Sequence, residues 1–374
     1  MARSGTSMAR DDLHPGYLGS GSGAILAAVE SYRGDRSDRR YTMTSARRFL
    51  PVVLLAAVAV SACRTSSSHQ APELPSAPIL VGGVPEAFSL LGEPLYAPEM
   101  PEAVRGERDR ELAAAWAALA AAPGDAEALI WVGRRLGYLG RYREAVAAFS
   151  EGIARFPDDA RFLRHRGHRF LTLRRLDLAE ADLARAAELV RGRPDEVEPD
   201  GLPNERGIPT STLQSNVWYH LGLARYLRGD FDGALAAYRE CLAVSNNPDM
   251  LVATSHWLYM TLRRLARPGL ETAEAAEVLA AIDADLDIIE NQTYHRLLLM
   301  VRDELAPGEV LAEAGSDSGS LDFATVAYGI ATWHLYNGRE AEARALYERI
   351  LQGGQWAAFG FVAAEAEVAR SRGR

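Results

Sequence analysis

Several residue types and patterns are scarce in this sequence, and each scarcity narrows the classes of protein to consider. No lysine occurs, so all 41 basic residues are arginines. The two cysteines, Cys63 and Cys241, are too few for a disulfide framework, and no zinc-finger spacing is present. Acidic residues outnumber basic ones, giving a formal net charge of −9. Duplex-binding domains normally carry excess basic charge, so the sequence predicts no nucleic-acid partner.

Known catalytic motifs are also missing. The chain contains no G-x-S-x-G, no Walker loop and no H-E-x-x-H, and it shows no cofactor-binding motif. His165 and His168 could share a metal ion, but a metal site needs a third or fourth ligand. The sequence therefore predicts a non-enzyme without cofactor or metal. An enzyme built from converging histidine and arginine side chains stays an alternative.

An export signal is predicted within residues 43–62. Arg47 and Arg48 precede an apolar run, 49–60, that is well short of the roughly 20 residues of a membrane-spanning helix. Since export signals normally begin a chain, residues 1–42 are interpreted as an upstream segment that results from a misassigned start. The alternative is an unusually long positively charged region ahead of the apolar run.

The end of this signal, Val60-Ser61-Ala62-Cys63, resembles the lipobox of bacterial lipoproteins. The resemblance implies that Cys63 is acylated and becomes the mature N-terminus. It also implies a lipid-anchored protein of the bacterial cell envelope that faces the periplasm. Because Arg64, not aspartate, follows the cysteine, the resemblance favours the outer membrane.

Residues 63–107 are rich in proline and are predicted to form a tether. Helices and central strands do not tolerate this proline density. Five apolar residues could still pack part of the tether onto the folded domain: Phe88, Leu90, Leu91, Leu95 and Tyr96. The seven prolines are Pro72, Pro75, Pro78, Pro85, Pro94, Pro98 and Pro101.

After residue 107 the apolar residues follow helical spacing, with no convincing alternating β-branched run. Self-comparison shows a period of 34 residues, which separates Gly133 from Gly167 and Ala145 from Ala179. This pattern of small and aromatic positions resembles the tetratricopeptide repeat. Units at 126–159 and 160–193 match it. A third unit, the closest match, carries Trp218, Leu221, Gly222, Gly229, Ala234 and Tyr238.

The resemblance implies an all-α fold over 108–374, a right-handed superhelix of about six antiparallel helix pairs and a terminal helix. The second and third units are separated by about 21 extra residues, 192–212, which read as an inserted loop. This loop could cover the repeats as a lid or be a solvated excursion, and the sequence favours neither.

In the repeat family, the first helix of each pair lines a concave groove that binds partners. The resemblance assigns nine residues of this chain to that groove: Arg134, Arg161, Arg164, His168, Asn216, Tyr219, Tyr226, Trp257 and Tyr294. Six histidines also fall on expected first helices: His165, His168, His220, His256, His295 and His334. Such a groove would suit an acidic or aromatic peptide.

The resulting hypothesis is an envelope-anchored scaffold or assembly factor that binds another envelope protein. One alternative is a protein that binds a small ligand or a cell-wall glycan by stacking it on Tyr219, Trp257 and Tyr294. An open groove would favour a protein partner, whereas a closed pocket under the loop at 192–212 would favour a small ligand.

Overall fold

The computed structural model describes residues 83–266 and 271–372, which form fourteen helices and one two-stranded sheet. The signal peptide and Cys63 lie outside the described residues. The strands are β1 (Ala87–Phe88) and β2 (Pro94–Leu95). The helices are α2 (Glu102–Ala121), α3 (Ala126–Tyr138), α4 (Tyr142–Arg155), α5 (Ala160–Thr172), α6 (Leu176–Val190), α7 (Leu213–Arg228), α8 (Phe231–Val244), α9 (Pro248–Leu265), α10 (Ala273–Ala280), α11 (Gln292–Val301), α12 (Pro307–Glu313), α13 (Leu321–Tyr336), α14 (Glu340–Leu351) and α15 (Phe359–Arg372).

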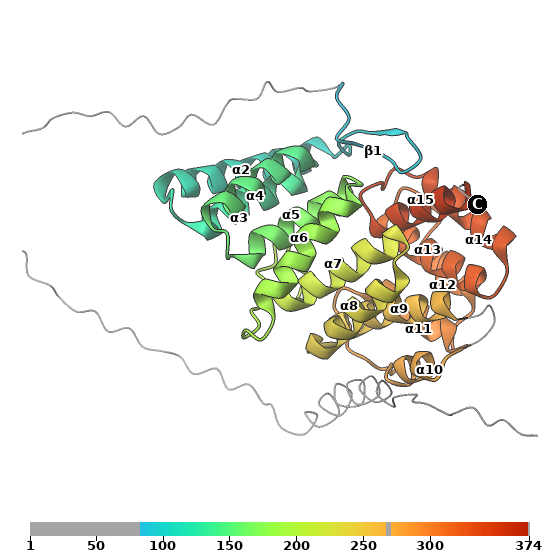
Figure 1. Cartoon of the computed structure of the whole chain (residues 1–374). Coiled ribbons are helices and arrows are strands. Elements are labelled where there is room, and N and C mark those ends of the chain that lie inside the picture. The colour runs from blue at the N-terminus through green and yellow to red at the C-terminus, as the bar shows by residue number, and fades with distance from the viewer. Residues whose placement is uncertain (1–82, 267–270, 373–374) are drawn as a thin grey trace, which may run out of the picture.

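The fold is an all-α, tetratricopeptide-like solenoid, as the sequence predicts. Consecutive helices pack in pairs, most extensively α3 with α4, α5 with α6, α7 with α8, and α13 with α14. Figure 1 shows these pairs stacked in chain order from α2 to α9. Within the described ranges, no helix is both long and apolar enough to cross a membrane.

Close packing within three of these pairs depends on repeated glycines. A Cβ atom added at Gly133 would lie 2.3 Å from the Phe149 ring, and one at Gly167 would lie 2.7 Å from Leu183 Cγ. At Gly222 the added atom would lie 2.6 Å from the Tyr238 ring. These glycines allow the two helices of a pair to approach because no side chain separates them.

Repeated aspartates set where the first helices begin. Asp125 accepts a hydrogen bond from the Glu127 amide at 2.9 Å, and Asp159 accepts one from the Arg161 amide at 3.0 Å. Both are N-cap residues that satisfy an amide left unpaired at a helix start. The α7 helix starts with a capping box between Thr212 and Ser215.

The expected boundary between tether and helical domain is not where the structure has it. Helix α2 begins at Glu102, and residues 83–101 are partly packed onto the domain. Leu95 is buried, whereas Phe88 and Tyr96 are exposed. The β1–β2 hairpin pairs Ala87 with Leu95 and Phe88 with Pro94, and it tolerates this proline because so short a pairing needs few amide donors. Helix α12 has no counterpart in the sequence prediction either.

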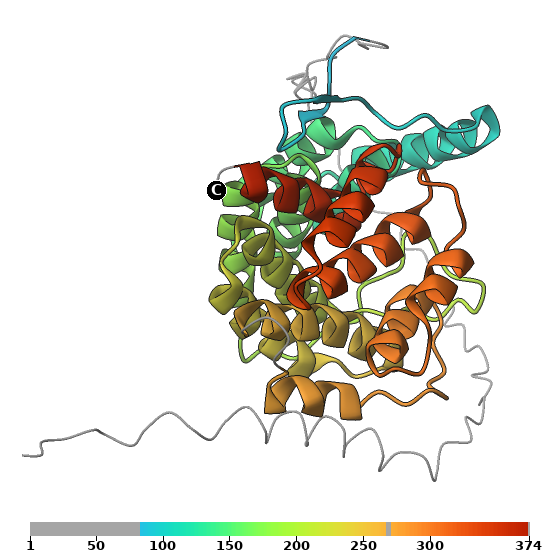
Figure 2. The same cartoon turned by 90° about the vertical axis from the view of Figure 1, so that its right-hand side faces the viewer.

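The C-terminal helix returns to the middle of the solenoid. Glu365 of α15 forms a buried ion pair with Arg174, in the α5–α6 connection, at 2.8 Å. Glu367 pairs with Arg264 at the end of α9, and the Arg370 guanidinium donates to the Leu227 carbonyl at the end of α7. Figure 2 shows α15 crossing the centre of the molecule. The solenoid therefore closes on itself in its C-terminal half.

The hairpin adds to this closure. The Leu90 amide donates to Glu365 Oε2 at 3.1 Å, and the Trp356 indole donates to the Tyr96 carbonyl at 2.8 Å. Residues far apart in the chain are thus joined around α15, which packs against α7, α13 and α14.

Candidate partner-binding site

The aromatic residues predicted for the groove lie inside the molecule. Trp257 is 1% exposed and stacks on Tyr328 of α13, with ring centroids 5.8 Å apart. Tyr226 is fully buried and accepts a hydrogen bond from the Tyr328 hydroxyl at 3.2 Å. The Tyr219 hydroxyl donates to Tyr294 at 3.2 Å. Tyr219, Tyr226 and Trp257 are therefore core residues, and Tyr294 is partly buried against them.

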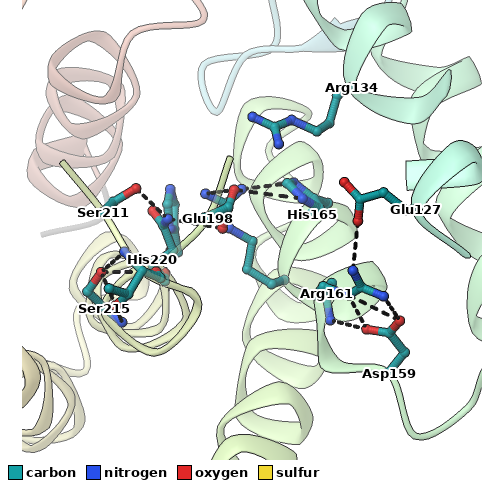
Figure 3. Close-up of polar contacts among 12 residues, drawn as sticks. Glu127, Arg134, Asp159, Arg161, His165, Glu198, Ser211, Ser215 and His220 are labelled. Atoms are coloured by element: carbon teal, nitrogen blue, oxygen red, sulfur yellow. Dashed lines mark hydrogen bonds and ion pairs between the residues drawn. The ribbon is translucent and has the colours of Figure 1, made fainter. Parts of the chain in front are cut away.

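Arg161 lies at the turn between two repeats, where it lines a hollow together with Asp159 and residues 193–196. Its guanidinium pairs with Asp159 at 2.6 Å and with Glu127 of the preceding unit at 2.7 Å. The side chain therefore links two repeats across the turn that separates them. Figure 3 shows this arginine turned toward both carboxylates.

The remaining predicted residues gather on the inner side of α3, α5 and α7. Arg134, Arg164 and His168 lie there together with residues that were not assigned to the groove. We call the following six side chains the basic cluster: Arg134, Arg164, His165, His168, Arg169 and His220.

Ring contacts define how the histidines of the cluster lie. The rings of His168 and His220 have centroids 4.5 Å apart, and Phe359 at the start of α15 lies 5.3 Å from His168. His165 stacks on Phe149 at 5.3 Å. His220 Nδ1 lies 2.6 Å from the Asn216 carbonyl, which requires a proton on that nitrogen.

Burial and like charge keep these imidazoles neutral. Burial lowers the pKa of His220 to about 3. Burial lowers the pKa of His165 and of His168 well below the usual range, and neighbouring arginines lower it further. Positive charge in the cluster is therefore carried by its three arginines, although burial also lowers the pKa of Arg164 and of Arg169.

The arginines of the cluster keep unused donors. Arg134 donates to the Tyr138 hydroxyl at 3.3 Å and lies over the Trp131 ring. Within the described ranges, Arg169 makes no side-chain hydrogen bond or ion pair, and its guanidinium lies 5.4 Å from the Tyr142 ring centroid. The Arg164 Nε atom is buried without a partner. Donors of this kind suit an anionic group.

One carboxylate reaches the cluster from the inserted segment 192–212, which we call the strap. Glu198 pairs with Arg164 at 3.0 Å, lies 3.7 Å from His165 Nε2 and accepts a hydrogen bond from Asn216 at 3.1 Å. Figure 3 shows Glu198 between His165 and His220, with Arg134 extending toward the same region from α3. Among the described residues, no other carboxylate contacts the cluster.

The strap also touches the wall of the cluster on α3. The Arg135 guanidinium donates to the Gly201 carbonyl at 3.2 Å. A Cβ atom at Gly201 would lie 1.8 Å from the Tyr138 hydroxyl, so the backbone passes directly over that side chain. The sequence left open whether 192–212 covers the repeats as a lid or is a solvated excursion. In the structure the strap is folded across the inner face.

Sequence reasoning missed Arg169 and Glu198. Arg169 follows His168 directly, but it occupies no position that the repeat family assigns to the groove. Glu198 lies in an insertion without periodicity, so no pattern indicates which way it points. His165 and His220 could have been included, because their placement on first helices was a visible signal. The prediction that the nine assigned residues bind a partner stays a prediction.

The described residues contain no group of three or more histidine, cysteine or acidic side chains arranged to hold a metal ion. Cys241 is buried, and burial raises the pKa of its thiol to about 12. A thiol with this pKa is a packing residue and a poor nucleophile.

Comparison with known proteins shows similarity to one repeat family. Residues 215–248, which comprise most of α7 and all of α8, match the tetratricopeptide repeat family. A solved structure described as "Crystal Structure of P58(IPK) TPR Domain at 2.5 A" matches with 14% identity and a TM-score of 0.20, covering 72% of this chain and 95% of that one. No curated protein matches this chain.

Proposed function

We propose that this chain is a scaffold that binds an acidic segment of a second protein at the basic cluster. The observation that supports the proposal is the gathering of three arginines and three histidines around a single carboxylate, in a chain of net charge −9. Tetratricopeptide repeats generally mediate binding between proteins, and residues 215–248 match that family.

The chemistry of the cluster suits carboxylates. Arg134 and Arg169 lie at its half-buried edge and have donors free for bidentate pairing with an incoming carboxylate. Partial burial strengthens such pairs because solvent screens them less than on an open surface. The buried, neutral histidines provide hydrogen-bonding groups without adding repulsion between cations.

The cellular location of this binding is proposed from the sequence alone. Acylation of Cys63 and attachment to the outer membrane, facing the periplasm, would restrict the partner to proteins of the cell envelope. Incorporation of a palmitate analogue tests this part. Label should enter the natural chain and be lost in Cys63→Ala, and persistent labelling of that variant would contradict the anchor.

Site-specific photocrosslinking in cells tests the binding proposal. A photoreactive amino acid replaces Tyr138, which lines the cluster, or Tyr96, which is exposed elsewhere. A defined envelope protein should crosslink at position 138 and not at 96. Arg169→Gln should abolish that crosslink, whereas the matched control Arg185→Gln, on the exposed face of α6, should retain it.

The proposal would be contradicted if the same protein crosslinked equally at positions 138 and 96 and in the Arg169→Gln variant. Reproducible absence of capture would favour a small anionic ligand instead, because the strap closes part of the site.

An enzyme is the second candidate, because His165, His168 and His220 converge near Glu198. This convergence is one that acid–base catalysis uses. Binding is favoured because, among the described residues, no serine, threonine or cysteine side chain forms a hydrogen bond with these imidazoles that would activate it as a nucleophile. Turnover of a small ester or phosphoester that is lost in His168→Gln would favour the enzyme.

A further inference from the structure

The strap presents its carboxylate to the basic cluster in the way a bound acidic ligand would. The Glu198 side chain is 11% exposed and receives Arg164 Nη2 and Asn216 Nδ2 on its two oxygens. Removing this carboxylate would leave three arginines without any acidic partner at the cluster. Glu198 therefore occupies the position at which an incoming carboxylate would find the most favourable contacts.

Outside the cluster, the strap is held mainly by solvent-exposed polar contacts. Arg206 pairs with Asp287 at 2.8 Å, with side chains 47% and 73% exposed. Asn204 and Thr210 both donate to Glu290. Exposed pairs of this kind contribute little to stability because water competes for them.

Little apolar burial holds the strap in place. Its three largest apolar side chains, Val197, Leu202 and Ile208, are 64%, 50% and 45% exposed. Gly192 and Gly207 have φ angles of 72° and 62°, so the backbone bends at both places in a conformation that glycine adopts without strain. Release of the strap would therefore expose little new apolar surface.

We infer that the strap is an intramolecular competitor, in which Glu198 stands in for the partner's carboxylate and the partner displaces the strap when it binds. This inference rests on the proposed function. The closed strap lowers the apparent affinity for an acidic segment by the fraction of molecules in which the cluster is free. A competitor of this kind also restricts binding to partners with enough carboxylates to replace the contacts of Glu198.

The test measures binding of a fluorescein-labelled oligoglutamate peptide to the full chain by fluorescence anisotropy, with oligoglutamine as the uncharged control. Glu198→Gln should bind oligoglutamate about tenfold more tightly, because the neutral amide competes poorly for Arg164. Glu205→Gln removes the same charge from an exposed position of the strap and should leave the affinity close to that of the natural chain.

A second variant separates displacement from a simple gain of positive charge. Asp287→Asn weakens the distant attachment of the strap without changing the cluster. It should increase the affinity for oligoglutamate several-fold, since a looser strap leaves the cluster free more often. An affinity equal to that of the natural chain would contradict displacement even if Glu198→Gln bound more tightly.

Limited trypsin digestion reports on the strap directly. Arg206 is the one arginine inside the strap at which trypsin can cut, because Arg193 precedes Pro194. Saturating oligoglutamate should accelerate cleavage after Arg206, and so should Glu198→Gln without peptide. Tight binding with unchanged cleavage would overturn the inference and leave the proposed function standing. If oligoglutamate binds neither the natural chain nor the Glu198→Gln and Asp287→Asn variants, the proposed function itself is overturned.

Discussion

The inner face of the first helices differs between the two halves of the molecule. On α3 and α5 it carries arginines and histidines, several of them half-buried, beside a strap held by polar contacts. On α7, α9 and α11 it carries Tyr226, Trp257 and Tyr294, packed against one another and against α13. The same repeat geometry thus makes a candidate binding surface in one half and core in the other.

The register of a repeat therefore sets which side chains point inward, but it does not set whether the inward side is buried or open to solvent. In the C-terminal half the chain curves until α13 packs against α9 and α11, and α15 packs against α7. The apolar surface buried there stabilises the closed arrangement. In the N-terminal half no described helix covers α3, and charged side chains can remain hydrated.

The largest expected effect comes from breaking the closure. Glu365→Ala leaves Arg174 buried and unpaired, because the two side chains are 0% and 2% exposed. The free energy of unfolding should fall by about 3–5 kcal/mol, as measured by chemical denaturation of the full chain. The control Glu188→Ala, in an exposed ion pair with Arg185, should cost at most about 1 kcal/mol. Equal losses in the two variants would show that α15 does not stabilise the fold.

Removing a ring from the aromatic half is expected to act on stability. Trp257→Ala should lower the free energy of unfolding by about 3–5 kcal/mol, since the ring is fully enclosed. Trp116→Ala on α2, where the ring is 36% exposed, should cost less than about 1 kcal/mol. A stable Trp257→Ala variant that loses partner crosslinking would mean that this half is a groove after all.

Acid should weaken the charged half through its neutral histidines. Because the pKa of His220 is lowered to about 3 from the ordinary 6.5, the unfolded chain binds more protons below about pH 6.5. The stability that neutral His220 contributes is complete above that pH and is lost as the pH falls toward 3. Between pH 7 and 5, unfolding free energy should fall by up to about 1.4 kcal/mol per pH unit below 6.5 for each such histidine.

In His220→Gln the slope of the unfolding free energy against pH should decrease by the contribution of one histidine. Chemical denaturation at several pH values measures this slope. His334→Gln, which removes a half-exposed imidazole, should change the slope less. An unchanged slope in His220→Gln would mean that His220 has an ordinary pKa in the folded protein.

The smallest effect is expected at Arg161. Its partners Asp159 and Glu127 are partly exposed, so Arg161→Gln should cost at most about 1 kcal/mol of stability. Binding of oligoglutamate should be unchanged in Arg161→Gln and at least tenfold weaker in Arg169→Gln. Equal weakening in the two variants would extend the site beyond the basic cluster.

Much of the fold could be predicted because it depends on contacts between neighbours in the chain. The 34-residue spacing of Gly133 and Gly167, and the matching aromatic and aliphatic positions, specify helix pairs that pack closely. Placement of all six histidines on first helices is also confirmed. The start of α2, helix α12 and the β1–β2 hairpin were missed, because short or proline-flanked segments carry weak periodic signals.

The amino-acid sequence specifies the helix pairs and the placement of arginines and histidines on the first helices α3, α5 and α7. Which inward positions are core and which belong to the candidate site depends on the tertiary structure. The tertiary structure in turn depends on contacts between distant residues, such as Arg174 with Glu365, 191 positions apart. Another is the contact of Arg164 with Glu198, which lies in a segment without periodicity. Periodicity reports how a helix faces its neighbours, whereas closure depends on curvature accumulated over many pairs.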